Sequence, residues 1–282
     1  MKILKEKRCI IGEGPIWNEF EELLYFVDGM QKEIYTYDPE SGILLTYPQE
    51  VCVAAIGFAK DGRMLVSRSD GAFFLDLKSG AAQPMYGGYV RIVHGNDAKV
   101  GPDGAFYIGT QSEYRLGISQ NIDGKLYRID SVGNVDILLD NLILPNGMDW
   151  SVDNRFFYLV DSGTHMIRKY EFDLNAGNLV FTGLEAQVQG ADGLTVNNHG
   201  DILVACWGKR CIAVVDPETM TVTGRIDIPT RAPASCAFFG KEMNLLAVST
   251  ASLSTDITCD ADAGFLFIKQ MEIAGRLPFL FG

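Results

Sequence analysis

The chain repeats one pattern of polar and apolar positions six times. In each repeat a fixed position, which we call the slot, is followed ten residues later by a short apolar segment, with a tight turn such as Asp61-Gly62 or Asp103-Gly104 in between. The slots recur every 41 to 50 residues along the chain. The six slot residues are Glu13, Ala54, Asn96, Asn146, Asp192 and Ser235.

The apolar segments are short and rich in β-branched and aromatic residues, so we expect each to form a strand. A second such strand follows, and in five repeats it ends at an aspartate. Units of roughly 40–50 residues made of short strands and turns are typical of propeller blades. Long amphipathic helical patterns are absent. We therefore predict an all-β fold, a single six-bladed β-propeller over residues 1–282. The apolar segments are 23–27, 64–66, 106–108, 156–160, 202–205 and 245–248.

The third repeat is the longest because of the stretch 111–123, which lacks a strand pattern. An insertion at this point of a blade is expected to form a flap over one end of the channel. A surface loop without function is the alternative.

Four slot residues carry oxygen ligands, namely Glu13, Asn96, Asn146 and Asp192. The first strand of a propeller blade lines the central channel. Residues just before that strand should therefore face one another at one channel mouth. Carboxylates and carboxamides gathered there are costly to desolvate without a cation, and oxygen ligands suit Ca²⁺, Mg²⁺ or Mn²⁺. Taken singly, each residue also fits ordinary turn or loop chemistry.

Composition narrows the function classes. The net charge of −12 disfavours nucleic acid as a partner. No apolar run approaches the roughly 20 residues of a membrane span, and the charged start 1–8 is unlike a secretory signal. We expect a cytoplasmic protein, a monomer or weak dimer, without membrane contact. The cysteines form no Cys-x-x-Cys pair, and no Gly-x-Ser-x-Gly elbow or phosphate-binding glycine loop is present.

The segments around the slots resemble the regucalcin/gluconolactonase family, which includes senescence marker protein and luciferin-regenerating enzyme. Their order and spacing along the full chain carry the resemblance. It implies a six-bladed propeller with one catalytic divalent metal, bound by Glu13, Asn146 and Asp192, with Asn96 near the substrate. The matching segments are 12–17 (GEGPIW), 96–100 (NDAKV), 145–151 (PNGMDWS) and 191–194 (ADGL).

Two positions depart from the family pattern. Members that act on sugar lactones often carry an arginine two positions before the slot asparagine, where this chain has His94. The family's lid can carry a substrate-contacting glutamate, and the aligned position here is Gln120. We expect Asn96, His94 and Gln120 to contact the substrate. Both departures concern the substrate and leave the metal ligands intact.

The favoured hypothesis is a metal-dependent lactonase that opens a small-molecule lactone, such as gluconolactone. The cation, with Ca²⁺ as first choice and Zn²⁺, Mn²⁺ or Mg²⁺ open, would stabilise the developing oxyanion. Asp192 is the candidate catalytic base, and water activated by the cation is the alternative. A second hypothesis is a calcium- or metal-binding regulatory propeller without turnover. A third, a protein-interaction scaffold, does not account for four polar slots.

Overall fold

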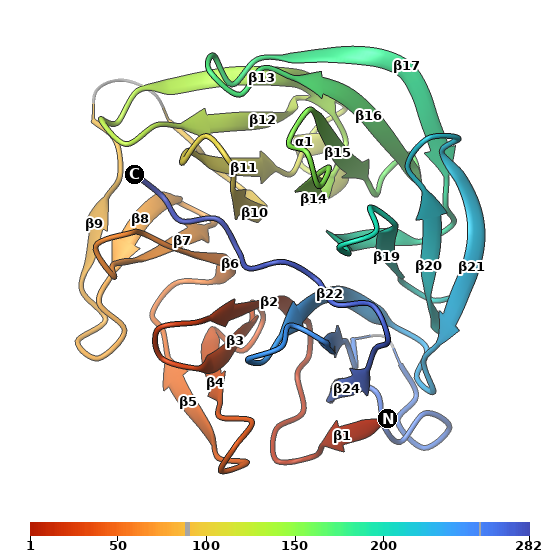
Figure 1. The fold of residues 1–282 in the computed structure, drawn as a ribbon. Coiled ribbons are helices and arrows are strands. Elements are labelled where there is room, and N and C mark those ends of the chain that lie inside the picture. The colour runs from red at the N-terminus through yellow and green to blue at the C-terminus, as the bar shows by residue number, and fades with distance from the viewer. Residues whose placement is uncertain (88–90, 254) are drawn as a thin grey trace.

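The computed structural model describes residues 1–87, 91–253 and 255–282 of the chain. Six four-stranded antiparallel sheets stand around a central axis like blades (Figure 1). The predicted six-bladed β-propeller is therefore confirmed. In the described ranges no helix is long and apolar enough to cross a membrane.

Five blades are built from consecutive strands. The first has β2 (Gly12–Asn18), β3 (Leu23–Asp28), β4 (Glu33–Tyr37) and β5 (Leu44–Pro48). The second has β6 (Val53–Phe58), β7 (Met64–Arg68), β8 (Gly71–Leu75) and β9 (Ala82–Pro84). The third has β10 (Gly95–Val100), β11 (Phe106–Thr110), β12 (Gly124–Ile129) and β13 (Val135–Leu142), with α1 (Glu113–Leu116) between β11 and β12. The fourth has β14 (Pro145–Trp150), β15 (Phe156–Asp161), β16 (Met166–Phe172) and β17 (Leu179–Gln187). The fifth has β18 (Ala191–Val196), β19 (Ile202–Cys206), β20 (Cys211–Asp216) and β21 (Thr221–Asp227).

The sixth blade joins the two ends of the chain. It consists of β22 (Pro233–Phe239), β23 (Leu245–Thr250), β24 (Leu266–Gln270) and the N-terminal β1 (Lys2–Leu4). The outermost strand β1 pairs antiparallel with β24, with Lys2 opposite Ile268 and Leu4 opposite Leu266. These hydrogen bonds close the ring, because the last blade takes its fourth strand from the other end of the chain.

The strand assignment made from the sequence was wrong in one respect. The apolar segments expected to line the channel are the second strands of their blades, β3, β7, β11, β15, β19 and β23. The innermost strands are the slot segments themselves. Their glycine, proline and asparagine residues disfavour strands locally, but pairing with the second strand overrides that preference.

Every innermost strand carries a β-bulge at or beside its slot residue. In the first blade the pairing jumps from Glu13 opposite Val27 to Ile16 opposite Tyr25, which leaves one extra residue in β2. The same shift of one residue recurs in the other five innermost strands. A bulge re-aims the side chains beside it. The repeated bulge therefore influences the direction of the side chains at or next to each slot.

The cores lie between neighbouring blades and exclude solvent. Between the third and fourth blades, Trp150 packs edge-on against Tyr107 with ring centroids 4.9 Å apart and contacts Phe157 at the same centroid distance. Trp150 and Phe157 are fully buried. Such aromatic contacts fix the rotation of one blade against the next, and thereby the positions of the innermost strands.

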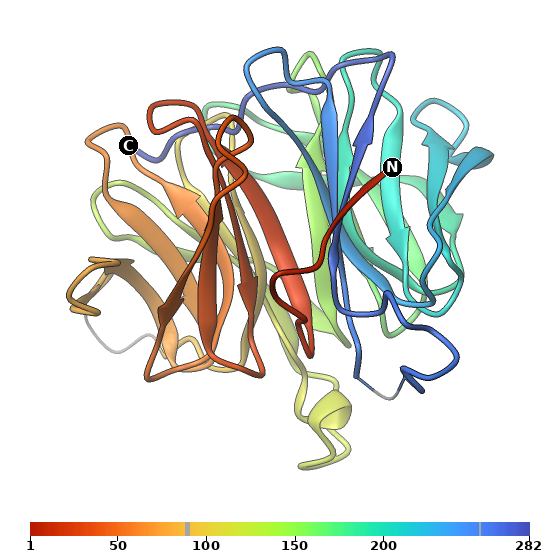
Figure 2. The same ribbon diagram turned by 90° about the horizontal axis from the view of Figure 1, so that it is seen from below.

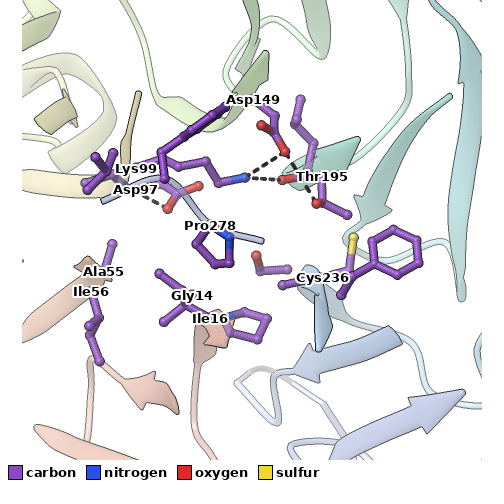
Figure 3. Close-up of a pocket in the computed structure, with 18 of the residues that line it drawn as sticks. Gly14, Ile16, Ala55, Ile56, Asp97, Lys99, Asp149, Thr195, Cys236 and Pro278 are labelled. Carbon is purple, nitrogen blue, oxygen red and sulfur yellow. Dashed lines mark hydrogen bonds and ion pairs between the residues drawn. The ribbon is translucent and has the colours of Figure 1, made fainter. Parts of the chain in front are cut away.

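The segment 271–282, which we call the C-terminal strap, crosses the face opposite α1 (Figures 1 and 2). It is hydrogen-bonded to several blades in turn: Asn198 N donates to Ala274 O at 2.9 Å, and Lys60 N donates to Phe281 O at 3.1 Å. Pro278 of the strap lies in the middle of the ring of channel residues (Figure 3). The strap therefore fills the channel from this side.

A buried carboxylate, Asp149, links the channel wall to the strap, and Figure 3 shows its contact with Lys99 of the wall. Asp149 Oδ2 lies 3.1 Å from Lys99 Nζ, and Asp149 Oδ1 lies 2.8 Å from Arg276 Nη2. Burial opposes the ionisation of Asp149, but the charges of Lys99 and Arg276 outweigh it and hold the pKa of Asp149 below its usual range. Asp149 is therefore a compensated carboxylate.

We expect Arg276→Ala to lower the free energy of unfolding by about 1–3 kcal/mol, because it removes one of two cations from a buried carboxylate. Urea denaturation at pH 7 measures the loss. Arg63→Ala, which breaks an exposed pair with Asp61, is the control and should cost less than about 1 kcal/mol. Equal losses for the two variants would contradict this role for Arg276.

Candidate functional site

The polar slot residues converge at the channel mouth on the side of α1. Asn146 Nδ2 donates to Asp192 Oδ1 across two neighbouring innermost strands, and also to Ser162 Oγ at 3.2 Å. Asn96 Nδ2 donates to Pro145 O at 3.1 Å. Hydrogen bonds thus link three consecutive blades at this point, through the side chains of Asn146 and Asp192 and through the backbone of Pro145 next to Asn146.

A cavity of about 240 Å³ opens at this mouth. Its wall includes three of the polar slot residues, together with His94 and a side chain of the flap, Leu116. Asp192 lies behind the wall, where it is buried against Asn146. The lining residues are Ile11, Glu13, Gly29, Met30, Cys52, Ala54, Ser69, His94, Gly95, Asn96, Asp97, Gln111, Leu116 and Asn146.

Close approach between innermost strands accounts for the glycines that follow two slots. A Cβ atom on Gly147 would lie 2.3 Å from the backbone N of Leu194, and one on Gly193 would lie 2.2 Å from Ser235 Oγ. Neither position tolerates a side chain without displacement. Asn146-Gly147 and Asp192-Gly193 are therefore not turn dipeptides: both lie in strands packed against the next blade.

Buried aspartates fix the backbone that leads into two slots. Asp161, at the end of β15, accepts hydrogen bonds from Ile143 N at 3.1 Å and Leu144 N at 2.8 Å, just before Asn146. Asp28, at the end of β3, accepts from Ile10 N at 2.6 Å and Ile11 N at 3.3 Å, just before Glu13. The same device thus positions the metal-ligand candidates of the first and fourth blades.

Sequence reasoning missed the role of these two aspartates, although the signal was present. Segments 23–28 (LLYFVD) and 156–161 (FFYLVD) share the tyrosine and the final Val-Asp, and they occupy the same place in their repeats. The other four second strands end in Arg68, Thr110, Cys206 and Thr250. The aspartate therefore marks the two blades whose slots hold Glu13 and Asn146.

The acidic groups at the mouth form no ion pair within the described residues. Burial, then the charges of Asp192 and Asp97, raise the pKa of Glu13 well above its usual range. Burial and the charge of Asp97 also raise the pKa of Asp192, against the opposing hydrogen bond from Asn146 and the charge of Arg115. Burial raises the pKa of Asp97 as well.

The donor set suits a hard cation. Glu13 accepts only from Gly14 N, at 3.4 Å, and neither Glu13 nor Asp192 forms an ion pair within the described residues. A divalent cation would remove this uncompensated charge. No group of three or more His, Cys, Asp or Glu side chains in the described ranges is arranged to hold a metal. The candidate set of Glu13, Asp192 and Asn146 has two such side chains and one carboxamide, all oxygen ligands.

The candidate substrate contacts are placed unevenly. His94 and Asn96 line the cavity. Gln120 lies in the exposed loop after α1 and does not reach the cavity wall. Gln111, which the sequence reasoning did not single out, lines the cavity and donates through Nε2 to Asn96 Oδ1 at 3.4 Å.

The stretch 111–123 projects from the propeller face beside the channel mouth (Figure 2). It contains α1, and Ser112 caps this helix by accepting from Arg115 N at 3.1 Å. Leu116, at the end of α1, lines the cavity. The flap expected from the sequence thus contributes a side chain to the mouth.

We expect Asp161→Ala to lower the free energy of unfolding by about 2–4 kcal/mol, because it strands buried N–H groups of the segment before Asn146. Asp173→Ala is the matched control: Asp173 also accepts two backbone N–H bonds, from Asn175 and Ala176, but in an exposed turn. That change should cost about 1 kcal/mol or less. Chemical denaturation of both variants checks the difference, and equal costs would contradict the role given to Asp161.

The raised pKa values of Glu13 and Asp192 predict how the metal-free protein responds to pH. In the unfolded chain both groups ionise near pH 4, whereas in the folded chain they stay protonated to higher pH. The folded state then binds more protons, so the free energy of unfolding falls as pH rises from about 4 through the folded pKa values. Thermal unfolding with a chelator present measures this slope.

The variant Glu13→Gln should flatten that decline, whereas Glu19→Gln, a change at an exposed position, should leave it intact. Identical slopes for wild type and Glu13→Gln would show that the acidic pair does not control the stability of the metal-free protein.

Known proteins are similar to this chain over nearly its whole length. A family model described as SMP-30/Gluconolactonase/LRE-like region matches residues 11–252. A putative sugar lactone lactonase of Bacillus subtilis is 26% identical over 98% of this chain and 96% of its own, and a pentonolactonase of Haloferax volcanii is 29% identical over 96% and 94%. Rabbit (Oryctolagus cuniculus) regucalcin is 26% identical over 97% and 95%.

A solved structure shares the same fold. The crystal structure of a calcium-binding protein, regucalcin, from Agrobacterium tumefaciens superposes with a TM-score of 0.87 at 22% identity, covering 99% of this chain and 96% of that one. The family match spans all six slots and two of the four strands of the sixth blade. This chain belongs to the SMP-30/gluconolactonase/LRE-like family.

Proposed function

We propose that this protein is a divalent-metal-dependent hydrolase that opens the ring of a lactone. One observation carries the proposal: two carboxylates without an ion pair in the described residues, and a carboxamide, lie together on three different innermost strands, with Glu13 and Asn146 lining a small cavity and Asp192 buried beside Asn146. Relatives named as a sugar lactone lactonase and a pentonolactonase, each similar over nearly the whole chain, support the reaction class.

Glu13, Asn146 and Asp192 would hold one divalent cation, with Ca²⁺ as the first choice. Such a cation supplies electrostatic stabilisation of the negative charge that develops on the carbonyl oxygen when a lactone is attacked. The name regucalcin among the relatives supports calcium. Asn146 would bind the ion through Oδ1. The amide nitrogen Nδ2 already donates to Asp192 and Ser162, and this hydrogen-bond network decides which amide atom is the oxygen.

Asn96 is suited to hold a substrate hydroxyl or ring oxygen. Its amide already donates one N–H to Pro145 O and accepts one bond from Gln111 Nε2, which fixes its orientation. One N–H and one lone pair remain for a ligand. The ring of His94 lines the same cavity and adds a second polar contact.

Asp192 would accept the proton of the attacking water as the new C–O bond forms at the carbonyl carbon. The ring C–O bond then breaks, and the departing alkoxide oxygen takes that proton to give the hydroxy acid. A ligating carboxylate is a weak base, so direct activation of the water by the cation is the competing route to the same product.

The test is a matrix of metals and lactones. Protein stripped of metal and reloaded with Ca²⁺, Mn²⁺, Mg²⁺ or Zn²⁺ should open neutral γ- or δ-lactones only when a metal is present. Asp192→Asn should lower kcat by about 10²-fold or more, whereas Asp173→Asn, in an exposed turn, should not. Calorimetry would show whether a metal binds.

Metal binding without turnover of any lactone would contradict the hydrolase and leave the regulatory metal-binding propeller. Turnover that is independent of metal would contradict the role given to the cation.

A further inference from the structure

Part of the cavity wall is apolar and has no part in the proposed hydrolysis. Ile11, Met30, Cys52 and Leu116 line the cavity alongside the polar slot residues. Met30 is 57% exposed and Leu116 is 39% exposed. Exposed hydrophobic side chains that border a cavity mark a place where an apolar ligand group gains from burial.

Local structure holds Met30 in place. Met30 N donates to Asp28 Oδ1 at 3.0 Å, so the buried aspartate that fixes the approach to Glu13 also fixes the turn that carries Met30. A Cβ atom on the preceding Gly29 would lie 3.1 Å from Cys52 Sγ. The turn therefore packs directly on the second blade, and Met30 and Cys52 belong to one surface.

Leu116 is held from the flap. Glu113 N donates to Asp123 Oδ1 at 2.8 Å, and Tyr114 N donates to Asn121 O at 2.9 Å. Gly117 ends the helix in the left-handed conformation, with a φ of 70°. The flap is thus a folded turn with its own hydrogen bonds, and it carries Leu116 to the cavity wall.

The charges of the wall are of one sign. Glu13 and Asp97 are acidic, and no lysine or arginine is among the lining residues in the described ranges. Arg115 precedes Leu116 on α1, but its side chain is exposed and does not line the cavity. A carboxylate or phosphate on the substituent of a ligand, away from the cation proposed at Glu13, Asn146 and Asp192, would therefore find no cationic side chain on the wall.

We propose that the cavity takes an uncharged lactone bearing an apolar substituent, which lies between Met30 and Leu116, and that it disfavours lactones bearing a carboxylate or phosphate. This inference rests on the proposed function and names its substrate class. The ring and its carbonyl face Asn96, Asn146 and Glu13, and the substituent points along the apolar wall to the mouth.

Burial of each methylene of such a substituent contributes up to about a fourfold gain in kcat/KM. The gain ends when the substituent passes Leu116 and reaches solvent. A polyhydroxylated neutral lactone lacks this gain but is not repelled by the acidic side chains. A lactone with a carboxylate at the same position lacks the gain and is also repelled, so we expect its kcat/KM to be at least tenfold below that of the alkyl lactone.

The experiment uses the metal-loaded protein and δ-lactones of one ring size, substituted with hydrogen, with alkyl chains of increasing length, and with a carboxylate. Corresponding lactams, which resist opening, are titrated calorimetrically as a second readout. The expected result is a rise of about two- to fourfold per methylene in kcat/KM and in lactam affinity, with the carboxylate compound weakest.

The double variant Met30→Ser/Leu116→Ser should flatten the dependence on chain length. Val132→Ser, a change at an 80% exposed residue outside the cavity, should preserve it. Leu116→Arg should raise the relative rate of the carboxylate lactone at least tenfold, since it supplies the missing cation at the mouth.

Lactone opening with no chain-length dependence, or with the carboxylate lactone preferred, overturns this inference while the proposed hydrolase stands. Loss of that carboxylate preference in Arg115→Met would identify Arg115 as the responsible cation. Conversely, absence of opening for every lactone overturns the hydrolase, and the lactam titrations then decide separately whether the apolar wall selects ligands.

Discussion

The approach of six innermost strands to one axis is the constraint on which this molecule depends. The strands come so close that a single β-carbon at Gly147 or Gly193 would collide with the neighbouring blade. Because the backbones are this near, one side chain from each blade suffices to surround a small volume. The bulge of one residue in every innermost strand then decides which side chain that is.

Much of this arrangement could be predicted from the sequence, because the repeat recurs at a nearly constant spacing. The number of blades and the clustering of Asn96, Asn146 and Asp192 follow directly from that register. The identity of the innermost strands does not, since segments such as GEGPIWN and PNGMDW resemble turns until their pairing partners are known. Local composition indicates the preference of each residue, whereas pairing with the adjacent strand determines that these segments form strands.

Other features depend on contacts between distant parts of the chain. The strand β1 has three residues and no periodicity to detect, and it exists because β24 offers an unpaired edge. The strap lies outside the repeat altogether. Gln120 was selected by alignment to a lid, but it lies in the exposed loop after α1, and Gln111 contacts Asn96 instead. The spacing of the repeat does not predict where the residues of an inserted loop lie.

Two electrostatic regimes occur along the same channel. Asp149 is buried and ionised, because Lys99 and Arg276 compensate it. Glu13 and Asp192, nearer the flap, are buried without such partners, and their pKa values move in the opposite direction. Asp149 forms ion pairs with two cations, whereas neither Glu13 nor Asp192 forms one within the described residues. The part of the channel around Asp149 therefore stabilises the fold, and the part around Glu13 and Asp192 is left to bind a ligand.

The strap makes the two ends of this channel different. With Pro278 inside the ring on one side, the cavity lies at the opposite mouth beside the flap residue Leu116, and we expect substrate and product to use this mouth. Ring opening of a neutral lactone would create an anion in a cavity walled by Glu13 and Asp97. A cation held by Glu13, Asn146 and Asp192 would attract that anion, and no lysine or arginine of the described lining adds to the attraction, so the cation alone would retain the charged product.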